Sequence, residues 1–129
     1  MKPLIAVLLV VIAVIGSLKV LSPQKPSVQG TVTNANTPDI IYYWGEGCSH
    51  CESLKKYILE NKIEERFQIT YKEVWGNQDN LNDLKETAKL CPDIDLSQGI
   101  GVPFVFFTAD KKCVVGDSPV IEKIEQMIK

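Results

Sequence analysis

Residues 40–51 read IIYYWGEGCSHC. The first five residues, Ile40 to Trp44, form an unbroken apolar run of strand-forming types, which predicts a short central strand buried on both faces. The two cysteines lie at the start of the next segment, residues 49–62, where apolar side chains recur at helical spacing. A Cys-x-x-Cys pair that opens a helix after a buried strand is typical of a redox-active dithiol.

The position of each cysteine in this pair predicts its role. Free backbone N–H groups and the helix dipole at a helix N-terminus favour the thiolate form of Cys48, which makes it the expected nucleophile. Cys51 lies one turn further on, close enough to form a small disulfide and to release a partner from a mixed disulfide. Two other interpretations stay open for the pair: a zinc site, which needs more ligands, and a purely structural disulfide.

Three neighbours of the cysteines are candidates for supporting roles. His50 is the only histidine in the chain, and a protonated imidazole there would stabilise the Cys48 thiolate and make the disulfide more oxidising. The alternative for His50 is an inert surface residue. Glu46 either assists proton transfer or is solvated. Trp44 either shields the disulfide and contacts partners or belongs to the core.

Hydrophobic patterns predict the remaining elements. Residues 67–75 alternate as a second strand, residues 102–107 (VPFVFF) form a buried strand, and residues 113–115 pair back on it as a hairpin. One amphipathic helix has its apolar positions at Leu81, Leu84, Ala88 and Cys91. Ser118 and Pro119 are typical of the N-cap and first position of a last helix. The order β-α-β-α-β-β-α predicts an α/β fold, a mixed four-stranded sheet with helices on both faces.

The segment W-G-E-G-C-S-H-C, together with Gly101-Val102-Pro103 at the start of a later strand, resembles the thioredoxin superfamily over residues 38–129. The resemblance implies a thioredoxin-like fold and thiol–disulfide exchange with protein substrates, with the dithiol as the redox centre and no metal or organic cofactor. It also implies that Pro103 is cis and packs against the dithiol. Val102 would then present its backbone to an extended substrate.

The chain shares features with more than one branch of this superfamily. The turn Gly116-Asp117 before the last helix resembles glutaredoxins, which implies glutathione as an alternative co-substrate. A histidine directly before the second cysteine is similar to periplasmic disulfide oxidases. Many thioredoxins have a buried aspartate six residues before the nucleophile, and that position is Tyr42 here. A non-catalytic binding module that uses the groove around Pro103 is a further alternative.

Cys91 and Cys113 form a second candidate pair. A structural disulfide between them would close a loop that contains the Gly-Val-Pro segment and would contribute about 3 kcal/mol in the chain-entropy model. Two independent buried thiols, or a second redox pair that relays electrons to the first, are the other interpretations. Two cysteine pairs behind an apolar leader favour an oxidising, extracytoplasmic compartment.

The N-terminal region differs in composition from the rest of the chain. Residues 1–21 contain the nearly unbroken apolar run LIAVLLVVIAVIGSL, which we expect to be a helical membrane anchor. A cleaved signal peptide, which would leave the domain secreted, and a segment that is not exported are the alternatives. Residues 22–37 are rich in Pro, Ser, Thr, Asn and Gln and predict a flexible linker to the domain at 38–129.

Composition limits the class of protein and its partners. The chain has 129 residues, a formal net charge of −2 and 45% hydrophobic residues, which argues against nucleic-acid binding and against a disordered chain. The expected partners are protein thiols and disulfides and, through the apolar segment, a membrane. We expect the domain to be monomeric and to act as a membrane-tethered thiol–disulfide oxidoreductase.

Overall fold

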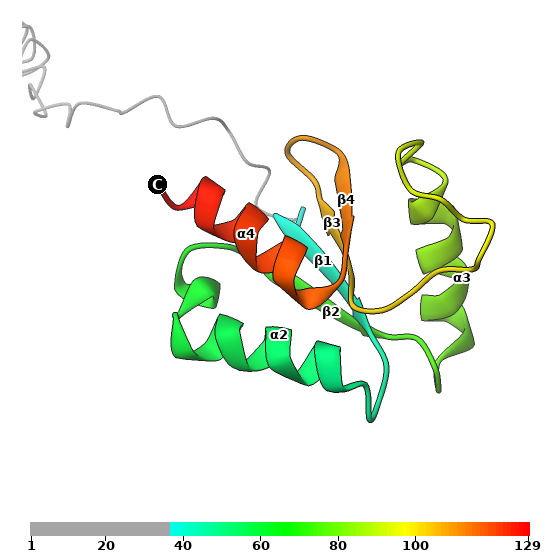
Figure 1. Cartoon of the computed structure of the whole chain (residues 1–129), viewed down its shortest axis with the longest axis horizontal. Coiled ribbons are helices and arrows are strands. Elements are labelled where there is room, and N and C mark those ends of the chain that lie inside the picture. Colours follow the sequence, from blue (N-terminus) through cyan, green and yellow to red (C-terminus); the bar gives the residue numbers. More distant parts are fainter. Residues whose placement is uncertain (1–36) are drawn as a thin grey trace, which may run out of the picture. The chain divides into compact units, whose positions relative to one another are not determined.

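Strand β1, Ile40–Trp44, lies inside the sheet, as its apolar sequence predicts, with β2 (Ile69–Glu73) on one side and β3 (Phe104–Phe107) on the other. It runs parallel to β2 and antiparallel to β3, and β4 (Lys112–Val115) completes the order β2-β1-β3-β4 as a hairpin with β3. The computed structural model describes residues 37–129 (Figure 1). Within that range the sheet is mixed and its strand order is thioredoxin-like.

The helices are α2 (Ser49–Glu60), α3 (Gln78–Ala88) and α4 (Asp117–Met127), with a short 3-10 helix, η1, at Ile63–Glu65. The predicted β-α-β-α-β-β-α order is therefore confirmed. Helices α2 and α4 pack on each other over one face of the sheet, and α3 lies on the other face (Figure 1). None of the helices between residues 37 and 129 has the length and apolar composition needed to cross a membrane.

Each face of the sheet has its own core. Successive side chains of a strand point to opposite faces, so the neighbours Tyr42 and Tyr43 belong to different cores. The first core joins the sheet to α2 and α4 through Ile40, Tyr42, Leu54, Ile58, Val105, Phe107, Val120 and Ile124. The second joins it to α3 through Tyr43, Leu84, Ala88, Phe104 and Phe106. The first core also holds the start of α2 against the sheet, because Cys51 belongs to it.

Several expected boundaries differ from the structure. The strand expected at residues 102–107 begins only at Phe104, because the residues before it form a loop that approaches α2. Helix α3 ends at Ala88, so Cys91 lies beyond it. The expectation that Ser118 caps the last helix is wrong, because Gly116 is the N-cap. The φ of Gly116 is +94°, which glycine adopts without strain, and the chain enters the helix two residues earlier.

The apolar segment expected at residues 1–21 lies outside the described residues, as does all of the expected linker except Thr37. The strand expected at 67–75 is shorter, because Phe67 and Trp75 flank β2 rather than belong to it. Both differences at β2 fall at the ends of an element, where pairing with β1 stops.

Candidate redox site

The turn between β1 and α2 places Cys48 at the N-terminus of the helix. Gly47 has a φ of +76°, which turns the chain out of the strand direction, and Cys48 follows as the N-cap of α2. The Cys48 Sγ accepts the backbone N–H of Cys51 at 3.2 Å. This N–H is one of the unpaired donors at a helix start, so negative charge on Cys48 Sγ is stabilised there, as the sequence predicts.

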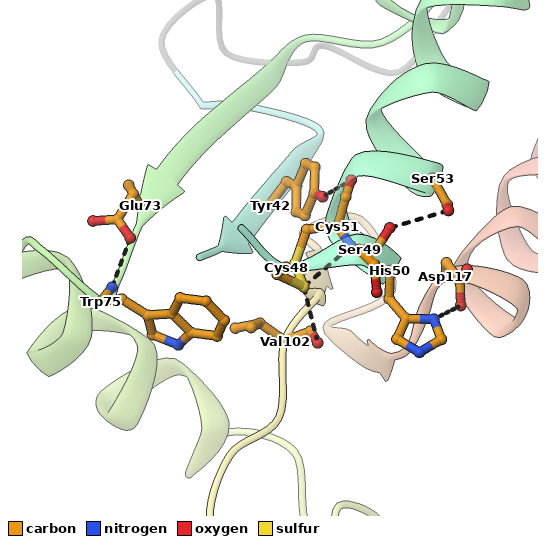
Figure 2. The surroundings of a disulfide bond; sticks show 10 residues. All are labelled: Tyr42, Cys48, Ser49, His50, Cys51, Ser53, Glu73, Trp75, Val102 and Asp117. Carbon is orange, nitrogen blue, oxygen red and sulfur yellow. Dashed lines mark hydrogen bonds and ion pairs between the residues drawn. A yellow bond between two sulfur atoms is a disulfide. The ribbon is translucent and has the colours of Figure 1, made fainter. Parts of the chain in front are cut away.

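Cys48 and Cys51 are joined in a disulfide, with their Cα atoms 5.2 Å apart (Figure 2). The two halves of the bond differ in access. Cys51 is only 2% exposed and belongs to the core between the sheet and the helices, whereas Cys48 is partly exposed. Of the two sulfurs, that of Cys48 is therefore the one accessible from solution.

The loop before β3 lies against the same sulfur. The carbonyl oxygen of Val102 is 3.7 Å from Cys48 Sγ, and Figure 2 shows the two residues facing each other. The Val102–Pro103 peptide bond is cis, as the resemblance implies, and Pro103 is buried. Its carbonyl oxygen accepts the N–H of Gly116 at 2.9 Å, which ties this loop to the start of α4.

Tyr42 stands at the position where the resemblance leads one to look for a buried acid. Its hydroxyl donates a 2.7 Å hydrogen bond to the carbonyl oxygen of Cys51. Burial, and to a smaller extent the charge of Asp117, raises the pKa of Tyr42 well above its usual value of 10. The phenol therefore stays protonated at neutral pH and anchors the helix at Cys51 as a donor, without acting as a proton acceptor.

His50 points away from the sheet toward the start of α4. Its Nδ1 lies 3.2 Å from Asp117 Oδ1, with the imidazole 71% exposed and the carboxylate 23% exposed (Figure 2). Partial desolvation raises the pKa of Asp117, but hydrogen bonds from His50 and from backbone N–H groups outweigh it and hold this pKa below its usual range. The ionised carboxylate accepts, so Nδ1 carries the proton in this contact.

Asp117 is a site residue that sequence analysis connected only with the glutaredoxin-like turn. It is 67 residues from His50, and no spacing rule links the two. The only sequence signal for Asp117 was indirect. The turn that contains it follows β4, and β4 pairs with β3, the strand that begins after the proline loop.

Trp44 and Glu46 lie on the other side of the disulfide. Lys55 Nζ sits 5.6 Å from the centre of the Trp44 ring, and a small cavity of about 140 Å³ opens between these residues and Cys51. Trp44 is partly buried against the core, and Glu46 is exposed. The Trp44 ring packs inward and also lines this cavity, while its expected contact with partners stays a prediction.

Cys91 and Cys113 are joined in a second disulfide, with Cα atoms 5.9 Å apart. Both are buried in the core beneath α3, on the opposite face of the sheet from Cys51. Electron relay between the two pairs would have to cross the sheet, so direct exchange between them does not fit the folded domain. The bond links the segment after α3 to the start of β4.

Within residues 37–129, no three His, Cys, Asp or Glu side chains come together in an arrangement that would hold a metal ion. Comparison with protein-family models and with curated proteins yields no match to this chain. What is thioredoxin-like here is a combination: the β2-β1-β3-β4 sheet order, and a Cys-x-x-Cys pair at the start of the helix that follows the central strand.

Proposed function

We propose that this protein is a thiol–disulfide oxidoreductase that exchanges disulfides with protein substrates through Cys48 and Cys51. The observation that supports this most is the unequal exposure of the pair at the start of α2, with Cys48 partly exposed and Cys51 only 2% exposed. A bond with one accessible and one protected sulfur is suited to exchange through a single mixed disulfide. A disulfide that spans four residues also constrains little of the unfolded chain, so as a purely structural bond it would add little stability.

The exchange has two steps. A substrate thiolate attacks Cys48 Sγ, the bond between Cys48 and Cys51 breaks, and Cys51 leaves as a thiolate that takes up a proton. A second substrate thiolate then attacks the substrate sulfur of the mixed disulfide and releases the Cys48 thiolate. Two electrons pass from the substrate dithiol to the protein, and the substrate leaves with a disulfide. The same steps in reverse reduce a substrate disulfide.

Neighbouring groups have separate roles in this proposal. The N–H of Cys51, 3.2 Å from Cys48 Sγ, stabilises the Cys48 thiolate when it is released. His50 adds to this stabilisation from the first turn of the helix. The backbone of Val102 lies beside the reacting sulfur and receives an extended substrate segment, and Pro103 shapes that groove. Trp44 borders the site from the side of the cavity.

The setting we propose is extracytoplasmic. Two disulfides in a domain of this size fit an oxidising compartment. The apolar run within residues 1–21 would hold the domain at a membrane, and residues 22–37 would let it reach partners there. In this proposal the domain acts as a monomer.

A trapping experiment tests the proposed function. The full-length Cys51→Ser protein, reduced and incubated with cell-envelope proteins, should accumulate mixed disulfides at Cys48, because the group that releases the partner is missing. Cys48→Ser is the matched control and should trap none, since its three remaining cysteines are all buried. Equal trapping by both variants, or none by either, would contradict the assignment. Partner binding that persists in a Cys48→Ser/Cys51→Ser protein would favour the non-catalytic binding module instead.

A glutathione-dependent reaction is the second candidate. The observation in its favour is that the Gly116-Asp117 turn lies beside the dithiol, joined to it through His50 and to the proline loop through the N–H of Gly116. Incubation of reduced Cys51→Ser protein with oxidised glutathione separates the candidates. A stable adduct of one glutathione on Cys48, formed faster than the mixed disulfides with proteins, would favour this second function.

A further inference from the structure

Trp75 is an exposed aromatic residue at the same end of the sheet as the dithiol. It lies just after β2, which runs parallel to β1, so both strands end at the edge where α2 begins. Its side chain is 61% exposed, and among the described residues it is the one aromatic side chain with such exposure. A large apolar side chain in this position is expected to contact a partner.

The indole of Trp75 is held in place on the redox site. A Cβ atom built on Gly45 would overlap the ring, so the indole lies directly on the glycine backbone. The carbonyl oxygen of Gly45 accepts the N–H of Cys48 at 3.2 Å. The glycine on which the indole lies is therefore hydrogen-bonded to the proposed nucleophile. Figure 2 shows the ring extending toward Val102, whose carbonyl oxygen lies 3.7 Å from Cys48 Sγ.

Glu73 fixes the loop that bears Trp75. Its two carboxylate oxygens accept the N–H groups of Trp75 and Gly76, each at 2.8 Å. Partial desolvation raises the pKa of Glu73, but these and further backbone N–H groups outweigh it and hold the pKa below its usual range. Hydrogen bonds to an ionised carboxylate therefore hold the backbone of this loop, and the indole rests on Gly45.

We propose that Trp75 forms an apolar subsite for the side chain next to the reacting cysteine of a protein substrate. The main-chain contact expected at Val102 accepts any sequence, whereas a fixed aromatic surface beside Cys48 favours an apolar neighbour. This inference rests on the proposed function and adds the class of substrate. The occupant is an extended segment in which a large apolar residue, such as Phe or Leu, lies beside the cysteine.

The charges around this surface specify the occupant further. The carboxylate of Glu73 lies at the base of this surface, where it accepts the N–H groups of Trp75 and Gly76, and a backbone N–H of Glu46 also bonds to it. An ionised carboxylate beside the ring favours a basic residue in the bound segment and disfavours an acidic one. We therefore expect substrates whose reactive cysteine has an apolar neighbour and a nearby Lys or Arg.

Exchange kinetics with matched peptides test the subsite. Reduced full-length protein in detergent is mixed with peptides whose single cysteine is joined by a disulfide to thionitrobenzoate, and release of the coloured thiol is followed. The Cys48 thiolate attacks the peptide sulfur, a mixed disulfide forms, and thionitrobenzoate leaves with the electron pair. The peptides differ only beside the cysteine, with Phe or Ser, and at one further position, with Lys or Glu.

The wild-type protein should react roughly tenfold faster with the Phe–Lys peptide than with the Ser–Lys peptide, a ratio that corresponds to about 1.4 kcal/mol. Trp75→Ala should remove this preference, and Trp75→Phe should keep most of it. Gly45→Ala should weaken it by displacing the ring while leaving Trp75 in the chain. Leu90→Ala, which removes an equally exposed apolar side chain just beyond α3, should leave the preference unchanged. The Phe–Glu peptide should react more slowly than Phe–Lys.

Hydroxyethyl disulfide has no side chain to fill the subsite. Reaction with it therefore distinguishes failure of the Trp75 subsite from failure of the proposed redox function. If every variant reacts with this small disulfide but the wild type shows no preference for Phe, or Trp75→Ala keeps that preference, the subsite is wrong and the redox function stands. If the wild type reacts with neither the peptides nor hydroxyethyl disulfide, the proposed function fails and the subsite fails with it.

Discussion

The imidazole Nδ1 of His50 lies 3.2 Å from the carboxylate of Asp117 and joins the first turn of α2 to the first turn of α4. The sole histidine of the chain is thus held at the redox pair by a residue from the last helix. This contact keeps the imidazole in the first turn of α2, the helix whose N-cap is Cys48.

Replacing His50 by alanine should make the disulfide less oxidising. A positive imidazole near Cys48 stabilises the thiolate of the reduced form, and its removal should lower the reduction potential by about 30 mV, which corresponds to about 1.4 kcal/mol for two electrons. Redox titration in glutathione buffers measures the shift. Ser49→Ala, at the preceding exposed position, should leave the potential unchanged. An unchanged potential in His50→Ala would mean that His50 is a surface residue that only contacts Asp117.

Replacing Tyr42 by phenylalanine should destabilise the domain without abolishing exchange. The variant loses the 2.7 Å hydrogen bond to the Cys51 carbonyl at a fully buried position, which should cost about 1 kcal/mol. Urea unfolding of the oxidised protein gives the change. Tyr71→Phe is the control, because the bond of Tyr71 to Glu64 is exposed and its loss should cost less. Loss of all exchange activity in Tyr42→Phe would contradict the structural role given to this hydroxyl.

Removing the second disulfide should lower stability and leave the redox site intact. Cys91→Ala/Cys113→Ala opens a link between residues 22 positions apart, and the expected loss is about 3 kcal/mol. Cys48→Ala/Cys51→Ala should lose much less, since that loop is short. The potential of the first pair should not move, because the two pairs lie on opposite faces of the sheet. A shifted potential would instead support electron relay.

Acid should weaken the contact between α3 and the sheet at Asp83. Burial raises the pKa of this carboxyl, but its bonds with Lys72 Nζ and the Tyr43 hydroxyl, each 2.6 Å, outweigh burial and hold the pKa below 3.8. A lowered pKa in the folded state means that this stabilisation is full above about pH 4 and is lost as the pH falls through the folded-state value.

Asp83→Asn should therefore flatten the dependence of the unfolding free energy on pH below 4. The loss at neutral pH should stay under about 1 kcal/mol, because the carboxylate is 44% exposed. Thermal unfolding between pH 2.5 and 7 provides the measurement, with Glu86→Gln on the exposed side of α3 as control. A pH dependence in Asp83→Asn as steep as in the wild type would rule out this contribution.

The sheet and its helices could be predicted because their signal is local. The apolar runs at residues 40–44 and 104–107 and the helical spacing after Cys48 each depend on a few adjacent residues. The start of α4 was predicted less well, since Ser118-Pro119 fits a cap by composition, whereas the positive φ of Gly116 depends on how the chain leaves β4.

The finer geometry of the candidate site depends on contacts between distant segments. The contact of His50 with Asp117 and the seat of Trp75 on Gly45 join residues far apart in the chain, and no periodicity encodes them. Both contacts can be identified only when the sheet and its helices are assembled. The hydrogen bond of Tyr42 to Cys51 is closer in sequence, but it requires knowing which face of β1 turns toward α2.

The reduction potential of the Cys48–Cys51 pair tests the central claim most directly. The full-length protein in detergent is equilibrated in glutathione and dithiothreitol buffers, free thiols are alkylated, and each cysteine pair is assigned by peptide mass. An exchange site should be reduced reversibly at a potential between about −120 and −270 mV. A pair that stays oxidised down to below about −300 mV would behave as a structural disulfide and would contradict the proposed function.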